Sequence, residues 1–264
     1  MTAVARRRAI AVAQTVPSRG GIEANLAEHV RLVRLAADAR PHVLVFPELS
    51  LTGYELDLAN ALAFTEDDSR LVPLIDVAQA SGITLVAGAP VRRGDRLHIG
   101  AFIISPGSSI ALYTKHHLGA FSEAARGDGT VPPAEATMFQ PGDLDPLIRF
   151  DGHTAAIAIC ADTGHPSHPQ AAANRGATTY LASMFVIPSD YVAETAGLQG
   201  YAARHSMAVA FANFGGPSGG LATAGRSAIW SDRGERLVQL DPAGAGVAVA
   251  IESADGWQTA AQRA

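Results

Sequence analysis

Two kinds of segment alternate along the chain: short runs of apolar, often β-branched residues, and longer stretches with apolar residues at every third or fourth position. The short runs predict β-strands over residues 9–14, 42–46, 83–87, 154–159, 178–182 and 209–213. The longer stretches predict helices over residues 22–37, 71–80, 170–175 and 191–206. In the first helix, for example, Ile22, Leu26 and Val30 fall on one face. This alternation is typical of an α/β fold, and we expect one domain over residues 1–264.

Residues 97–113 depart from this alternation. An apolar run, a turn at residues 105–108 (SPGS) and a returning strand over residues 110–113 predict a β-hairpin. Two later strands, residues 226–230 and 246–251, complete the pattern. Hairpins among strand–helix units predict mixed sheets rather than a purely parallel sheet.

The composition narrows the class of protein. Of the 264 residues, 48% are hydrophobic and 17% are charged, below the roughly 25% charge of an average globular domain, so a sizeable core is expected. A net charge of −5 gives no reason to expect nucleic acid or an anionic membrane as partner. The apolar run after Arg6-Arg7-Arg8 is shorter than the roughly 7 to 15 residues of a secretory signal. No apolar stretch approaches the roughly 18 residues that span a bilayer, so we expect a cytoplasmic protein.

Three chemically reactive residues each follow a predicted strand. Cys160 comes directly after residues 154–159, Glu48 after residues 42–46, and Lys115 after the returning strand of the hairpin. In open α/β sheets the carboxyl ends of the strands form the edge where ligands bind. A thiol, a carboxylate and an ammonium at one such edge would supply a nucleophile, a base and an electrostatic stabiliser.

Each of these residues also has an ordinary structural interpretation. A cysteine at the end of an apolar strand is more often an inert core residue, because free cysteine is among the most buried residue types. A glutamate after a proline commonly caps a turn, and a lysine beside two histidines is commonly a solvated loop charge. Spacing and composition alone therefore leave the function open.

Other candidate sites carry weaker signals. Cys160 is the single cysteine, which excludes an internal disulfide and a zinc site built from several cysteines. His165 and His168 are three residues apart among prolines, which does not favour a helical pair of metal ligands. The Gly-rich segment 215–220 lacks the Lys-Ser/Thr of a phosphate-binding loop, and we interpret it as a flexible loop near the site. The segment 127–142, rich in glycine and proline, is the longest predicted loop, and we expect it to lie over the site.

Taken together, the motifs of this chain resemble those of the nitrilase superfamily, the carbon–nitrogen hydrolases, over about residues 8–252. Residues 46–54 (FPELSLTGY) are similar to the glutamate motif of that family. Residues 113–118 (YTKHHL) are similar to its lysine motif, and residues 159–162 (ICAD) to its cysteine motif. The three motifs follow in the family's order, and a late strand ending at Asn213 matches as well.

The resemblance implies a fold and a set of site residues. The implied fold is a four-layer α-β-β-α sandwich with two mixed sheets, in a homodimer or a higher homo-oligomer. The implied catalytic residues are Glu48 as base, Lys115 as stabiliser of the oxyanion and Cys160 as nucleophile. The implied substrate-binding residues are Glu123, the backbone N–H of Ala161, and Tyr54. No cofactor and no metal are implied, and the sequence leaves open whether Glu48 or Glu123 activates the hydrolytic water.

The implied reaction is hydrolysis of a small non-peptide amide through a thioester. Many amidase members carry an arginine shortly after the cysteine motif, where this chain has residues 163–167 (TGHPS). Without that cation to bind a substrate carboxylate, a neutral amide is favoured over an N-carbamoyl amino acid. Nitrilases usually have Trp-Glu after the cysteine, where this chain has Ala161-Asp162, so nitrile hydrolysis is the second alternative.

Two alternatives lie outside this chemistry. A catalytically silent assembly subunit would be indicated by the loss of a triad member, and all three are present. A redox sensor that uses Cys160 would need a resolving thiol, which this chain could obtain only from another molecule.

Overall fold

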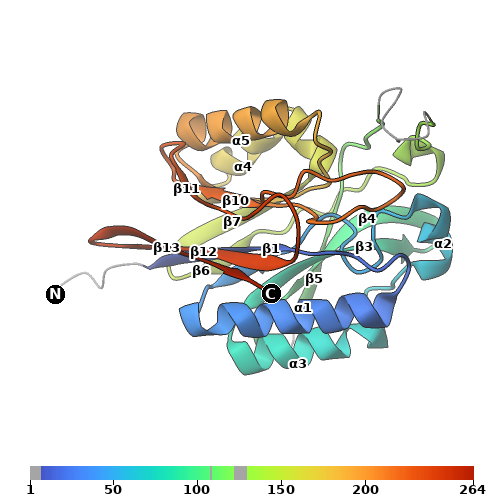
Figure 1. Ribbon diagram of the computed structural model, residues 1–264, viewed down its shortest axis with the longest axis horizontal. Coiled ribbons are helices and arrows are strands. Elements are labelled where there is room, and N and C mark those ends of the chain that lie inside the picture. Colours follow the sequence, from blue (N-terminus) through green and yellow to red (C-terminus); the bar gives the residue numbers. More distant parts are fainter. Residues whose placement is uncertain (1–6, 108, 122–129) are drawn as a thin grey trace.

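The computed structural model describes residues 7–107, 109–121 and 130–264. In these ranges two β-sheets lie face to face, with α1 and α3 over the outer face of one and α4 and α5 over the outer face of the other (Figure 1). The layers therefore run α-β-β-α, and the predicted fold class is confirmed.

The seven-stranded sheet has the order β13-β12-β1-β2-β3-β4-β5. Its strands are β1 (Arg8–Gln14), β2 (Val43–Val45), β3 (Thr84–Arg93), β4 (Arg96–Ile104), β5 (Ile110–Thr114), β12 (Gly246–Ser253) and β13 (Gly256–Arg263). Strands β1, β2 and β3 run parallel, and the remaining neighbours pair antiparallel, so the sheet is mixed. Helices α1 (Ile22–Ala36) and α3 (Val72–Ser81) cover it.

The six-stranded sheet has the order β11-β10-β9-β8-β7-β6. Its strands are β6 (Ile148–Phe150), β7 (His153–Ile159), β8 (Thr179–Ser183), β9 (Ala208–Ala212), β10 (Ala228–Trp230) and β11 (Arg236–Gln239). Helices α4 (Ser167–Asn174) and α5 (Tyr191–His205) cover its outer face, and the short α2 (Ala59–Leu62) follows the segment that carries Glu48. None of the helices in the described ranges is long and apolar enough to cross a membrane.

The core lies in three layers because side chains alternate between the two faces of each strand. In β1, Ile10 and Val12 belong to the cluster between the sheets, whereas Ala11 and Ala13 belong to the cluster under α1 and α3. A third cluster lies between the six-stranded sheet and its helices. Full burial of an apolar side chain such as Ile10 stabilises the folded state by about 1.5–3 kcal/mol. The sandwich buries the apolar side chains on both faces of β1, so the apolar pattern of this strand favours the layered fold.

All the predicted helices and strands are present, with differences in length and number. Strand β3 continues to Arg93, beyond the predicted end at residue 87, because it pairs with β4 through a turn at Gly94 with a φ of 61°. Strands β6, β11 and β13 and the short helix α2 were not predicted. Most β13 residues are exposed, so the strand has no alternating apolar pattern by which the sequence could indicate it.

Candidate active site

Glu48 is positioned by a tight turn after β2. Leu49 adopts a left-handed φ of 53°, and Ser50 N donates to Pro47 O at 3.2 Å. The turn packs directly on β3 at Gly88, where an added Cβ would lie 2.4 Å from Leu49 N. Glu48 N donates to Met184 O at 3.3 Å, which links this turn to the segment after β8 in the other sheet. The Glu48 side chain is fully buried.

Cys160 begins the 3-10 turn Cys160–Gly164 directly after β7. Its φ of 43° lies in the left-handed region, which a residue with a side chain seldom adopts and which is often found at functional sites. The sulfur lies 3.6 Å from Phe185 O, the oxygen atom to which the thiol donates. The sharp turn leaves Cys160 partly exposed, at the wall of a cavity.

Lys115 follows β5 and is fully buried. Its backbone is fixed on both sides, since Lys115 N donates to Ile99 O at 2.9 Å and Gly142 N donates to Lys115 O at 2.8 Å. The ammonium Nζ lies 2.6 Å from Glu48 Oε1. Glu48 and Lys115 extend from the seven-stranded sheet and Cys160 from the six-stranded sheet, so the site forms where the two sheets meet and not along the edge of one sheet.

A second carboxylate, Glu135, contacts the same ammonium. Both of its oxygens lie 2.8 Å from Lys115 Nζ. Glu135 Oε1 also accepts from the Tyr54 hydroxyl at 2.7 Å, and Oε2 accepts from Gly119 N at 2.7 Å. The side chain is only 2% exposed, and the short 3-10 turn Glu135–Thr137 carries it.

The sequence reasoning predicted Glu123 for this position. Residue 123 lies outside the described residues, and the glutamate that the structure brings to Lys115 is Glu135. One signal could have found it, because Glu135 is the single glutamate in the predicted loop 127–142. The described part of that loop does contribute to the site, as predicted.

Burial and the neighbouring charges shift the pKa values of the groups in the site. Burial raises the pKa of Glu48 to about 7, against the opposing charge of Lys115. Burial and the charge of Glu48 also raise the pKa of Cys160 well above its usual value. Burial acts to lower the pKa of Lys115, but the charges of Glu48, Cys160 and Glu135 outweigh it and raise that pKa. The resting site therefore holds a thiol, a permanent ammonium and a carboxyl group that titrates near neutrality.

The two oxygens of Glu48 differ in their contacts. Glu48 Oε1 accepts from Lys115, whereas Oε2 is buried and has no hydrogen-bond partner among the described residues. The Cys160 side chain is close enough to lower the pKa of Glu48. Glu48 and Cys160 are thus neighbours, although 112 positions separate them in the sequence numbering, from 48 to 160.

The cavity at Cys160 has a volume of about 140 Å³. Residues from several elements line it, among them Tyr54, Ala161, Gly119, Phe121 and Phe185. Tyr54 stacks on Phe185 with ring centroids 4.3 Å apart. The volume is below the roughly 300–1,000 Å³ of pockets for drug-sized ligands, so the cavity suits a small molecule.

The Asp162 carboxylate connects the turn that begins at Cys160 (the cysteine turn) to the residues around Lys115 (the lysine segment) by hydrogen bonds. Its Oδ2 accepts from Ile159 N at 3.0 Å and from the Tyr113 hydroxyl at 2.7 Å. Its Oδ1 accepts from His116 N at 3.1 Å and His117 N at 2.8 Å. The prediction that Asp162 has a structural role toward neighbouring N–H groups is confirmed.

The histidines near the site have structural partners. Both ring nitrogens of His168 are bonded to tyrosine hydroxyls, those of Tyr113 and Tyr180, at 2.9 and 2.8 Å. His165 stacks on His117 with ring centroids 3.7 Å apart. These contacts account for the polar atoms of His168 without a metal ion.

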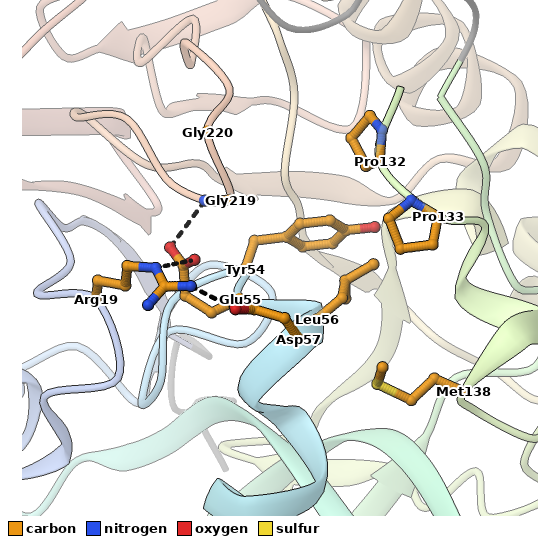
Figure 2. A pocket seen from close by; sticks show the side chains of 10 residues that line it. All are labelled: Arg19, Tyr54, Glu55, Leu56, Asp57, Pro132, Pro133, Met138, Gly219 and Gly220. Atoms are coloured by element: carbon orange, nitrogen blue, oxygen red, sulfur yellow. Dashed lines mark hydrogen bonds and ion pairs between the residues drawn. The ribbon is translucent and has the colours of Figure 1, made fainter. Parts of the chain in front are cut away.

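A larger cavity of about 830 Å³ lies beside the first and shares Tyr54 with it (Figure 2). Neither Cys160 nor Lys115 lines it. Figure 2 shows Arg19 turned toward Glu55, and their atoms Nε and Oε2 lie 3.0 Å apart. Gly219 N donates to the other oxygen of Glu55 at 2.8 Å, so the Gly-rich segment lies near the site, as predicted.

The chain is similar to several known proteins. A family model described as carbon-nitrogen hydrolase matches residues 9–262. A protein from Pseudomonas protegens named "Hydrolase in pqqF 5'region" is 30% identical over 234 residues, which cover 86% of this chain and 77% of that protein. A glutamine-dependent NAD(+) synthetase from Thermotoga maritima is 25% identical over 245 residues, 87% of this chain but only 39% of the synthetase.

Solved structures of an amidase from Nesterenkonia sp. AN1 are similar over 92% of this chain and 89% of theirs, with a TM-score of 0.80 and 25% identity. One is a mutant described as showing covalent addition of the acetamide moiety of fluoroacetamide at the active site cysteine. Another is a mutant in complex with butyramide.

Proposed function

Because the chain belongs to the carbon–nitrogen hydrolase family and is an enzyme of that class, we propose that it is an amidase that hydrolyses a small non-peptide amide to a carboxylic acid and ammonia. One observation carries this proposal: a buried ammonium, Lys115, lies between two buried carboxylates, Glu48 and Glu135, beside the single cysteine of the chain.

In the first half-reaction, Cys160 is the nucleophile and Glu48 the general base. Only a few per cent of a thiol with an ordinary pKa is ionised at pH 7, and burial lowers that fraction further here, so a base is needed at the moment of attack. Glu48 Oε2 takes the thiol proton as the sulfur bonds to the amide carbon. The same proton then passes to the leaving nitrogen, which departs as ammonia and leaves a thioester.

The negative charge that develops on the carbonyl oxygen needs donors. The Lys115 ammonium supplies one, and the backbone N–H of Ala161, which lines the cavity directly after the nucleophile, supplies another. Such a donor typically accelerates acyl transfer by about 10²- to 10³-fold. Glu135 holds Lys115 in place, and Tyr54 in turn holds Glu135 and forms part of the substrate wall.

In the second half-reaction, water hydrolyses the thioester and restores the thiol. Glu48 is the better candidate to activate this water, because both oxygens of Glu135 already accept hydrogen bonds from Lys115, Tyr54 and Gly119. Glu48 Oε2 accepts none from the described residues. A homodimer or higher homo-oligomer and a cytoplasmic location stay predictions from the sequence.

The proposal is tested by ammonia release from a panel of short aliphatic amides and the matching nitriles. We expect release from amides by the wild type, and none above background from Cys160→Ala or Glu48→Gln that retain the wild-type circular dichroism spectrum. Incubation with fluoroacetamide and mass spectrometry should find one adduct, on Cys160. Amide hydrolysis that survives Cys160→Ala would refute the mechanism, and release from nitriles alone would replace it by the nitrilase alternative.

A further inference from the structure

Two carboxylates that form no ion pair with any described residue line the cavity that holds Cys160. They are Asp190, which directly precedes α5, and Glu194, in the first turn of that helix. Their four-residue spacing places both side chains on one face of the helix, and that face is turned to the cavity. The third carboxylate of the cavity wall, Glu135, is already engaged by Lys115.

The two carboxylates have few polar contacts among the described residues. Within residues 7–107, 109–121 and 130–264, neither forms an ion pair. Asp190 accepts from Ser189 Oγ at 2.8 Å but makes no capping hydrogen bond to its own helix. Glu194 accepts only a long contact of 3.5 Å from Thr163 Oγ1.

The environment of Glu194 disfavours its charged form. Burial, together with the charge of Asp190, raises the pKa of Glu194. A cation placed between the two carboxylates would relieve their mutual repulsion. The described lining of the cavity contains no lysine, arginine or histidine that could do so, and none that could bind a substrate carboxylate.

The position of Cys160 in the cavity wall indicates where a ligand that brings this cation would react. Glu48, which is fully buried and has one oxygen without a hydrogen-bond partner among the described residues, interacts with Cys160, so the reacting carbonyl must bind at the sulfur. A substrate with its amide at Cys160 extends from that point toward the remaining walls, which include Asp190 and Glu194.

On the basis of the function proposed above, we propose that Asp190 and Glu194 select amides whose acyl chain ends in an ammonium group. The substrate class is therefore a short ω-amino amide, with the amide carbon at Cys160 and the ammonium at the α5 carboxylates. The small cavity restricts the chain to a few carbon atoms. Neutral amides of equal length bind without this ion pair, and amides with a terminal carboxylate are repelled.

The kinetic experiment compares 4-aminobutanamide with pentanamide, in which a methyl group replaces the ammonium. We expect the wild type to show at least about tenfold higher kcat/KM for the cationic amide, because partly desolvated ion pairs contribute strongly to selection. Asp190→Asn, Glu194→Gln and the double variant should each lower this ratio, by roughly tenfold in the double variant. A wild-type ratio of one or less would overturn the inference.

A carboxylate at a helix N-terminus also stabilises the helix, and a control separates the two effects. Glu23 is an exposed carboxylate in the first turn of α1, outside both cavities. Glu23→Gln removes the same kind of helix-terminal charge and should leave the substrate ratio unchanged. A ratio that falls as far in Glu23→Gln as in Glu194→Gln would show a general charge effect and would also overturn the inference.

A second measurement needs no turnover, so it stands even if the proposed function fails. Methanethiosulfonates form a disulfide with a thiolate and release methanesulfinate, and Cys160 is the single thiol of the chain. We expect 2-aminoethyl methanethiosulfonate to modify the wild type faster than the anionic 2-sulfonatoethyl reagent. The double variant Asp190→Asn/Glu194→Gln should bring the two rates together. Equal rates in the wild type would refute the inference, whereas a clear preference without any amide hydrolysis would refute only the amidase proposal.

Discussion

The Tyr54 hydroxyl donates to Glu135 Oε1 at 2.7 Å, and the same oxygen accepts from Lys115 Nζ at 2.8 Å. Tyr54 thus orients the carboxylate that orients the ammonium. Its ring stacks on Phe185 at the wall of the substrate cavity, so one side chain serves both the substrate surface and the charged centre.

Removal of the Tyr54 hydroxyl should lower activity more than stability. Tyr54→Phe keeps the stacked ring but leaves Glu135 with one donor fewer, and we expect kcat/KM to fall about tenfold with a loss of about 1 kcal/mol in the free energy of unfolding. Steady-state kinetics and urea unfolding check this. Tyr191→Phe, which loses only contacts of 3.4 and 3.5 Å, is the matched control and should retain full activity.

The pH dependence should report Glu48. Burial raises the pKa of Glu48 to about 7, and only the ionised carboxylate can accept the thiol proton. The value of kcat/KM should therefore rise with pH and level off above about pH 7. A profile that is already flat at pH 5 would show that another group is the base.

Replacement of Glu135 should move this profile in a defined direction. The charge of Glu135 is one cause of the raised pKa of Glu48, so Glu135→Gln should shift the acid limb to lower pH. It should also lower kcat by about 10²-fold, because Lys115 loses one of its two carboxylate partners. Loss of activity without any shift of the limb would contradict the electrostatic coupling.

Asp162→Asn should disturb both fold and site. Five groups face the carboxylate oxygens, and four of them are donors: Ile159 N, His116 N, His117 N and the Tyr113 hydroxyl. The fifth is the ring nitrogen Nδ1 of His117, 3.1 Å from Oδ1. An amide places an N–H₂ group against at least one of the four donors, and we expect a loss of about 1–3 kcal/mol in unfolding free energy. Since the carboxylate joins the cysteine turn to the lysine segment, kcat should fall more than KM changes. Unchanged stability would show that these hydrogen bonds contribute little.

His29 should make the protein sensitive to acid. The ring is buried between Phe46 and its partners Asn25 O and Ser50 Oγ, and burial lowers the pKa of His29 to about 4. The unfolded chain thus binds a proton that the folded chain does not, and stability should rise with pH between about 4 and 6.5, by on the order of 3 kcal/mol. Chemical unfolding at several pH values measures the slope, and His29→Asn should reduce it.

Most strands, the long helices and the positions of Glu48, Lys115 and Cys160 after strands could be predicted because each depends on local sequence. Cys160 and Lys115 follow strands directly, and strand ends are visible as the end of an apolar run. Glu135 could not be predicted in the same way, because it reaches Lys115 through a loop whose path depends on contacts with Gly119 and Tyr54.

The positions of Asp190 and Glu194 show the same limit. Asp190 and Glu194 look like ordinary residues at the start of a helix, and only the packing of α5 beside the cysteine turn places them in the cavity. The prediction that Glu48, Lys115 and Cys160 lie at the edge of one sheet was wrong for a related reason. These residues follow strands of two different sheets, and the sequence does not indicate how the sheets face each other.

Gly88 carries no chemistry and lies outside the cavity, yet it limits how this enzyme can be redesigned. The smallest side chain at that position would press on the backbone of the Glu48 turn, at Leu49 N and Pro47 O. Laboratory evolution toward new substrates can vary the cavity positions that have no proposed role in catalysis, but we expect substitutions at position 88 to displace the Glu48 turn and to abolish activity.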